Sequence, residues 1–171
     1  MKAARPKGGS IFGRPIYRSL EDIPGPVGLA VFLTPAQVVP GLMEQCGRLG
    51  ITRVVIESGG FKEYGAEGNL LSSQVCEIAG RYGIRFIGPN CLGVFNSRRG
   101  VATAFGPLET GFRIGGISVL SQSGGVMMTI LNALTTEGLG VSKMVSMGNK
   151  LDVNENDLLE YLIADPETQS I

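Results

Sequence analysis

"GGISVLSQSGGVMMTILNAL", residues 115–134, holds two apolar runs of different period on either side of S-Q-S-G-G at 121–125. The first run reads as a short strand, 116–121, and the second as a helix, 126–138. A strand that passes into a helix through serines and glycines has two explanations. It is either a plain turn capped by a serine or a turn whose amides face a phosphate.

The same alternation of strand and helix runs along the chain. The sequence predicts strands at 27–35, 52–58, 85–90, 116–121 and 142–148, and helices at 36–50, 70–83, 126–138 and 154–165. Uniformly apolar strands separated by helices predict an α/β fold with a parallel sheet covered on both faces.

The stretch 96–115 interrupts this alternation with glycines, charges and a proline. We interpret it as the crossing between two α/β units, 1–107 and 108–171. The second unit is expected to hold only two strands, which are too few for a stable sheet by themselves. We therefore expect a truncated unit or one that a partner completes.

Composition excludes several classes of function. The 171 residues carry a net charge of zero, which gives no reason to expect nucleic acid or an anionic membrane as partner. No apolar run approaches the roughly 20 residues that span a bilayer. The first ten residues lack the apolar region of a secretory signal, so we expect a cytoplasmic protein.

Cysteine and histidine counts limit the chemistry. Three cysteines lie far apart without a C-x-x-C, so neither a disulfide framework nor a metal site is expected. The chain has no histidine, so it cannot build a Ser-His-Asp triad or a Cys-His pair. We expect no catalytic residue of these kinds within it.

Four loops fall at the carboxyl ends of predicted strands, where parallel α/β sheets bind ligands: 34–35, 57–60, 88–91 and 121–125. Glycines there let backbone N–H groups approach an anion, and the next helix adds unpaired donors. Ordinary strand-to-helix turns with serine caps explain any single loop equally well. Four such loops in one sheet favour a ligand.

Three motifs are misleading. S-Q-S-G-G lacks the first glycine of a nucleophile elbow, and the chain has no histidine to serve it. N-K-L-D at 149–152 is typical of GTPases, but no phosphate-binding G-x-x-x-x-G-K-[ST] occurs. D-V-N-E-N-D at 152–157 lacks the glycine of a calcium loop, and Asn154 capping a helix with Asp157 explains it better.

Two single residues are ambiguous on spacing alone. Lys7 precedes two glycines in a basic segment, where a solvated loop lysine is the simpler interpretation. Cys91 follows G-P-N, and without a neighbouring base an inert, partly buried cysteine is favoured over a nucleophile.

Taken together, several segments resemble one family. "KGGSIFGRPIYRSLEDIPGPVGLAVFLTPAQVVP", "GFKEYG", "YGIRFIGPNCLGVFN", "SVLSQSGG" and "VSMGNKLDVNENDLLEYLIADPET" resemble the CoA-binding half of NDP-forming acyl-CoA synthetases. That family includes ADP-forming acetate–CoA ligases and the succinyl-CoA synthetase α-subunit, and the acetate type is the more similar. The resemblance runs from about Lys7 to the last residue.

The resemblance implies a Rossmann-like CoA-binding domain followed by the start of a flavodoxin-like, succinyl-CoA synthetase-like domain. The implied reaction is acid + CoA + ATP ⇌ acyl-CoA + ADP + phosphate, through a phosphohistidine. That histidine, together with the ATP/ADP and Mg site of an ATP-grasp domain or subunit, is expected outside this chain.

Site residues follow from the resemblance position by position. Lys7, Thr34, Pro35, Ser58, Gly59, Asn90 and Cys91 match positions that line CoA, the last two near its thiol end. Ser121, Ser123, Gly124 and Gly125 match the helix start that faces the phosphohistidine. The turn at 121–125 is thereby expected to present amides to a phosphate.

The chain also departs from the family. Only six residues precede Lys7, so we expect the first βαβ piece of the Rossmann-like domain to be lacking. The sheet edge thus exposed predicts a homodimer or low stability. The alternatives are a non-catalytic regulatory module that binds CoA or a nucleotide, and a degenerate remnant without a ligand.

Overall fold

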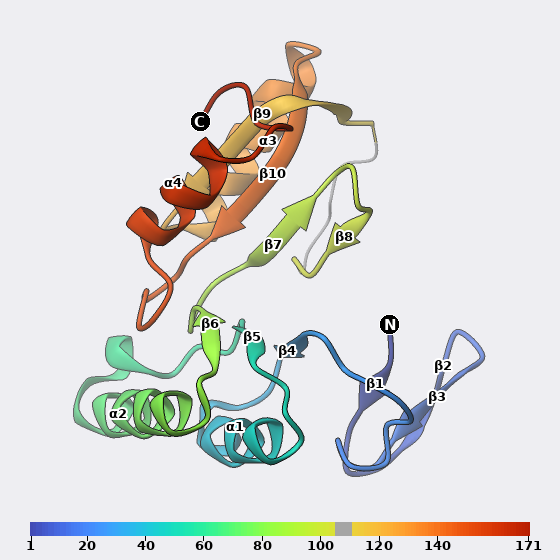
Figure 1. Cartoon of the computed structure of the whole chain (residues 1–171), viewed down its shortest axis with the longest axis vertical. Coiled ribbons are helices and arrows are strands. Elements are labelled where there is room, and N and C mark those ends of the chain that lie inside the picture. The colour runs from blue at the N-terminus through green and yellow to red at the C-terminus, as the bar shows by residue number, and fades with distance from the viewer. Residues whose placement is uncertain (105–110) are drawn as a thin grey trace.

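The computed structural model describes residues 1–104 and 111–171. Within these residues the strands form three sheets, and helices accompany two of them (Figure 1). The strand orders are β1-β3-β2, β4-β5-β6 and β8-β7-β10-β9.

The first α/β sheet contains β4 (Ala30–Phe32), β5 (Arg53–Ile56) and β6 (Arg85–Ile87), all parallel. The 3-10 helix η1 (Ala36–Val38) and α1 (Val39–Arg48) connect β4 to β5, and η2 (Lys62–Tyr64) and α2 (Gly65–Tyr82) connect β5 to β6. When parallel strands that follow one another in the sequence are also neighbours in the sheet, and their crossovers have the same hand, the connecting helices lie on the same face of the sheet. Accordingly α1 and α2 lie together on one face (Figure 1), whereas the sequence predicted helices on both.

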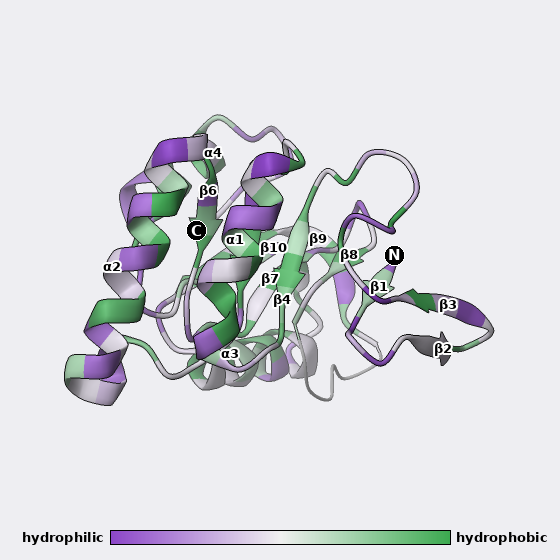
Figure 2. Ribbon diagram, turned by 90° about the horizontal axis from the view of Figure 1, so that it is seen from below, coloured by the Kyte–Doolittle hydropathy of each residue, from purple (hydrophilic) through white to green (hydrophobic). Residues whose placement is uncertain are grey.

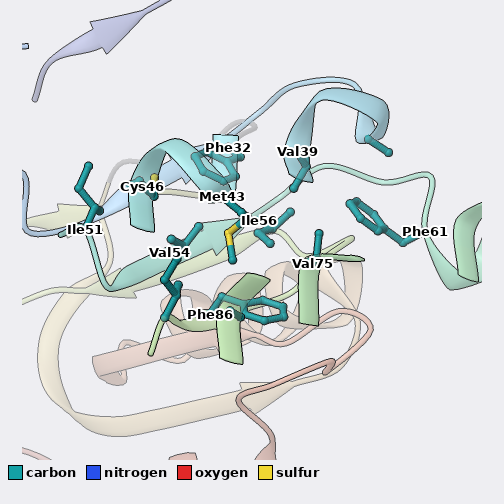
Figure 3. Packing of buried hydrophobic residues seen from close by; sticks show 14 residues of the cluster. Phe32, Val39, Met43, Cys46, Ile51, Val54, Ile56, Phe61, Val75 and Phe86 are labelled. Atoms are coloured by element: carbon teal, nitrogen blue, oxygen red, sulfur yellow. The ribbon is translucent and has the colours of Figure 1, made fainter. Parts of the chain in front are cut away.

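Apolar side chains from this sheet and its two helices form the larger core. Figure 3 shows Phe32, Ile56 and Phe86 of the strands meeting Met43 of α1 and Val75 of α2. Each such side chain contributes about 1.5–3 kcal/mol when it leaves water. In Figure 2, β4 is coloured as hydrophobic while α1 and α2 alternate between hydrophilic and hydrophobic turns, as expected of helices with one buried face.

The second α/β sheet has more strands than the sequence predicted. β9 (Arg113–Ser121) and β10 (Gly140–Ser146) are parallel, as expected. In addition β7 (Gly93–Asn96) pairs antiparallel with β10, and β8 (Val101–Ala102) pairs antiparallel with β7. Residues 111–171 thus contribute two strands, as expected, and β7 and β8 from the preceding segment complete the sheet.

Two helices accompany the second sheet. α3 (Gly124–Thr136) lies behind β9 and β10 in Figure 1, and α4 (Glu155–Ile163) lies in front. Met127, Leu131 and Met144 belong to the smaller core on the α3 side. The predicted boundary between residues 107 and 108 lies outside the described residues.

Residues at the N-terminus form a small sheet of their own. β2 (Gly9–Ile11) and β3 (Arg14–Tyr17) are antiparallel, and β1 (Ala3–Ala4) runs parallel to β3. Most of these residues are exposed, and the strands were not among those predicted from the sequence. Within the described residues, no helix combines the length and apolar character needed to cross a membrane.

Residues 147–153, which we call the joint segment, connect the two α/β sheets. Its backbone N–H groups donate to carbonyls on both sides: Met147 to Ser121 at 2.8 Å, Gly148 to Gln122 at 3.1 Å, Asn149 to Pro89 at 2.8 Å, Leu151 to Gly88 at 3.2 Å and Val153 to Phe86 at 3.1 Å. The sheets are therefore held together by main-chain hydrogen bonds.

Side chains of the joint segment add charged contacts. Asp152 accepts hydrogen bonds from Nε of Arg85 at 3.0 Å and from the Phe86 amide at 2.7 Å. Arg85 also reaches Asp157 at 3.2 Å. Asp157 and Asn154 form the capping box of α4, so the helix-cap interpretation of D-V-N-E-N-D is confirmed.

Glu57, directly after β5, is a buried carboxyl group. Its side chain is 5% exposed, and neither carboxyl oxygen has a hydrogen-bond partner among the described residues. Burial raises the pKa of Glu57 to about 7, and the nearby Thr103 hydroxyl opposes that rise only in part. The folded protein therefore favours the neutral acid at this position.

We predict that Gly148→Ala lowers the free energy of unfolding by roughly 2–4 kcal/mol. Gly148 has a φ of +59°, and a Cβ would lie 2.2 Å from the Pro89 carbonyl oxygen. Gly80→Ala is the matched control, since Gly80 lies in α2 with open space around its Cβ position. The free energy of unfolding of this control should rise by about 0.5–1 kcal/mol, because alanine is favoured over glycine within a helix. Urea unfolding followed by circular dichroism measures both, and equal stability of the two variants would contradict the prediction.

We further predict that Glu57→Gln changes how stability depends on pH. With a folded pKa of about 7 and an ordinary value of 4.5, the folded state holds a proton that the unfolded chain releases. The free energy of unfolding of the wild type should therefore fall by at most roughly 3 kcal/mol as pH rises from 4.5 to 7. Above pH 7 it should stay at the lower value.

The glutamine variant should lack most of this fall and be the more stable protein at pH 8. Thermal melting at several pH values between 4.5 and 8 measures it. Glu21→Gln, at an exposed glutamate, should keep the wild-type profile. A wild-type stability that rises between pH 5 and 7 would refute the assignment.

Candidate functional site

A pocket of about 530 Å³ opens at the carboxyl ends of β4 and β5. Backbone and side chains from the loops after β4, β5 and β6 and from the start of α2 line it: Pro35, Ala36, Gln37, Gly59, Gly60, Glu63, Tyr64, Glu67, Gly68 and Asn90. This is the edge at which parallel α/β sheets bind ligands.

Ser58 ties together the loops that form the pocket. Its hydroxyl donates to the Phe32 carbonyl at 3.4 Å and accepts from the Thr34 amide at 3.2 Å. Its own carbonyl accepts from the Asn90 amide at 2.9 Å. Ser58 is buried, so it supports the pocket from below while the next residue, Gly59, lines it.

Close packing shapes the α2 side of the pocket. A Cβ on Gly68 would lie 1.7 Å from the Phe61 carbonyl oxygen, so only glycine allows α2 to approach the loop after β5 this closely. Phe61 itself is fully buried in the larger core. The loop that carries Gly59 and Gly60 is thereby anchored at its far end.

Glu63 organises the same loop from the rim. Its Oε1 accepts from the amides of Gly60 at 2.7 Å and Phe61 at 3.2 Å, and its Oε2 accepts from Nδ2 of Asn149 at 2.6 Å. Partial burial alone would raise the pKa of Glu63, but these hydrogen bonds outweigh it and hold the pKa below its usual value. The group is therefore a carboxylate at neutral pH.

The structure brings together most of the residues predicted around CoA. Pro35, Gly59 and Asn90 line the pocket, and Thr34 and Ser58 are hydrogen-bonded directly beneath it. Lys7 is exposed in the turn between β1 and β2 and does not line the pocket.

Cys91 also lies outside the pocket lining. Its side chain is buried, and Sγ donates to the Ile56 carbonyl at 3.3 Å. Burial raises the pKa of the Cys91 thiol to about 12, so it stays protonated at neutral pH. These features are those of the inert cysteine that the spacing favoured.

The turn at 121–125 is built as a capped helix start. Ser123 is the N-cap of α3, where its hydroxyl accepts from the Val126 amide at 3.4 Å, and the Ser121 hydroxyl donates to the Ser123 carbonyl at 2.8 Å. A Cβ on Gly124 would lie 2.6 Å from Cβ of Leu92, whereas Gly125 is exposed. Both hydroxyls thus have local partners, as the plain capping explanation requires, and the turn does not line the pocket.

Two residues that were not predicted as site residues, Glu63 and Asn149, contribute to the site. Glu63 stands within the quoted segment G-F-K-E-Y-G, and Asn149 within N-K-L-D. A carboxylate three residues after a glycine at a strand end is a signal for bonds to the loop amides. Asn149 gives no such signal, because its partner is far away in the sequence. Among the described residues no cluster of three or more metal-ligating side chains is present.

Comparison with known proteins matches both parts of the chain to known families. Residues 3–97 match the CoA binding domain, and residues 114–171 match the succinyl-CoA ligase like flavodoxin domain. The chain is 41% identical to the ADP-forming acetate–CoA ligase I of Archaeoglobus fulgidus over 99% of its own length. It spans about a quarter (24%) of that relative's length.

Solved structures agree. PH0766 from Pyrococcus horikoshii OT3 superimposes with a TM-score of 0.91 at 35% identity, covering 98% of this chain and 38% of that one. The dinucleotide-forming acetyl-coenzyme A synthetase 1 of Ca. Korarchaeum cryptofilum, in complex with phosphate and ADP, gives 0.88 at 32% identity, covering 96% and 35%. The resemblance predicted from the sequence is confirmed: the chain belongs to the CoA binding domain family and is, over nearly its whole length, a homologue of the ADP-forming acetate–CoA ligases.

Proposed function

We propose that this chain binds coenzyme A in the pocket at the carboxyl ends of β4 and β5, as the CoA-binding portion of an NDP-forming acyl-CoA synthetase. The observation that carries the proposal is the position of the pocket. It lies within the residues that match the CoA binding domain, and Pro35, Gly59 and Asn90 line it.

Charge indicates which part of CoA enters the pocket. Glu63 and Glu67 line it, and Glu63 is ionised at neutral pH, so the phosphates of CoA are disfavoured there. The pantetheine arm is uncharged, and its amides can bond to the loop backbone and to Asn90. The phosphates then extend toward basic groups outside the pocket, for which we propose Lys7.

Thr34, Ser58 and Cys91 act in this proposal without lining the pocket. Thr34 and Ser58 fix the loops beneath the ligand, and the buried Cys91 packs beside Asn90 at the end toward which the CoA thiol points. Ser121, Ser123, Gly124 and Gly125 present the start of α3 to a phosphoryl group. A helix N-terminus offers unpaired amides and a positive partial charge for that purpose.

The complete reaction that we propose for the parent enzyme is acid + CoA + ATP ⇌ acyl-CoA + ADP + phosphate. The chain has no histidine, so the phosphohistidine comes from outside it. ATP, ADP and Mg are assigned to an ATP-grasp domain or subunit that acts with it. A second candidate is a non-catalytic module that binds CoA or a nucleotide and regulates or scaffolds.

Calorimetry with CoA tests the proposed function. Wild-type chain should bind CoA with an affinity in the micromolar to millimolar range, and Gly59→Val should lose binding. A Cβ on Gly59 would already lie 3.3 Å from Oδ1 of Asn90, so the rest of the valine must project into the pocket. Gly80→Ala, on the outer face of α2, is the control that should bind normally. No heat with millimolar CoA would favour the remnant without a ligand.

The contribution of Lys7 is a separate prediction. Lys7→Ala removes one cation and should weaken CoA binding about threefold to tenfold at low salt, because an exposed charge pair contributes on the order of 1 kcal/mol. The difference should shrink as salt screens the charges. Dephospho-CoA separates the two kinds of phosphate. If Lys7→Ala weakens its binding as much as that of CoA, the contact lies at the diphosphate that both ligands share. An affinity that does not change with Lys7→Ala at any salt would remove Lys7 from the site.

A further inference from the structure

Glu63 and Asn149 connect the rim of the pocket to the joint segment. The amide of Asn149 donates to Oε2 of Glu63 at 2.6 Å, while Oε1 of the same carboxylate accepts from the Gly60 amide at 2.7 Å. One carboxylate therefore contacts the loop that lines the pocket with one oxygen and the joint segment with the other. Hydrogen bonds to an ionised acceptor are the stronger kind.

The backbone of the joint segment is bonded in turn to the start of α3. Met147 donates to the Ser121 carbonyl at 2.8 Å and Gly148 donates to the Gln122 carbonyl at 3.1 Å. The side chain of Gln122 returns a bond to the Gly148 carbonyl at 3.3 Å. Asn149, which contacts Glu63 at the rim, therefore follows directly after Gly148, which is hydrogen-bonded to Gln122 of the turn.

Close packing joins the joint segment to the loop after β6. A Cβ on Gly148 would lie 2.2 Å from the Pro89 carbonyl oxygen and 2.5 Å from that of Asn90, so the segment is in direct contact with the loop after β6. The backbone N–H of Asn149 also donates to the Pro89 carbonyl at 2.8 Å. These contacts form a continuous path from the pocket loop to residues 121–122.

We propose that the Glu63–Asn149 contact couples occupancy of the pocket to the placement of the turn at 121–125, with Asn149 as a positioning residue. A ligand that shifts Gly59 and Gly60 moves the carboxylate of Glu63, and Asn149 carries that movement through Gly148 to the start of α3. This inference rests on the proposed binding of CoA, and it makes the turn respond to a ligand that it does not touch.

The test follows glycine amide signals by ¹⁵N NMR while CoA is added to the whole chain. In the wild type, CoA should shift the signals of Gly59 and Gly60 in the pocket and of Gly124 and Gly125 in the turn. Asn149→Ala should keep the pocket shifts, with affinity about threefold to tenfold lower for the lost hydrogen bond, and should lose the turn shifts. Glu63→Gln tests the same contact from the other side and should weaken the turn response.

Exchanging the carboxylate and the amide between positions 63 and 149 distinguishes a loss of coupling from a general loss of structure. In the double variant Glu63→Gln, Asn149→Asp, the new amide can donate to the new carboxylate, so the turn response should return. Asn149→Asp alone sets two carboxylates against each other and should abolish it. Glu21→Gln removes an exposed carboxylate outside the pocket and should leave the turn response intact.

The outcomes distinguish this inference from the proposed function. Shifts at Gly59 and Gly60 without any at Gly124 and Gly125 in the wild type would overturn the coupling and leave CoA binding standing. A turn response that survives Asn149→Ala, or a double variant that responds no better than Asn149→Asp, would also overturn it. The absence of every shift would contradict both the proposed CoA binding and the coupling, because the coupling requires the ligand.

Discussion

The hydrogen bonds of the joint segment, residues 147–153, are the constraint on which the arrangement of the two α/β sheets depends. Its first two amides, of Met147 and Gly148, donate to carbonyls at the end of β9, and those of Asn149, Leu151 and Val153 donate to carbonyls in β6 and the loop after it. Glycine at 148 is the condition for this, since its left-handed backbone lets the chain pass against Pro89 without a side chain. The ends of the two sheets that carry candidate functional loops therefore face the same strip of backbone.

Much of this organisation could be predicted from the sequence, because it rests on local patterns. The apolar runs gave the strands β4, β5, β6, β9 and β10 and the helices between them, with errors of a few residues at the ends. Asn154 and Asp157 were identified as a helix cap from a spacing of three, which is a local signal. Pro35, Gly59 and Asn90 were placed near one another because parallel strands end at the same edge of a sheet.

Features that depend on distant partners could not be predicted in this way. Gly93–Asn96 looks like part of a loop until β10 pairs with it, and no property of those four residues specifies a partner some fifty positions later. The same holds for Asn149, whose sequence context resembles a GTPase motif although its amide bonds to Glu63. Long-range pairing decided both cases, and a single sequence does not display it.

Two glutamates of one loop show how the fold assigns different roles to the same side chain. Glu57 lies under the sheet end without a hydrogen-bond partner among the described residues, so burial favours its neutral form. Glu63, six positions later, receives hydrogen bonds from two loop amides and from Asn149, so its charged form is favoured. The charge at the rim is therefore kept where it can hold the loop and transmit movement. At Glu57 burial instead raises the pKa to about 7, so this carboxyl group binds a proton more readily than Glu63 does.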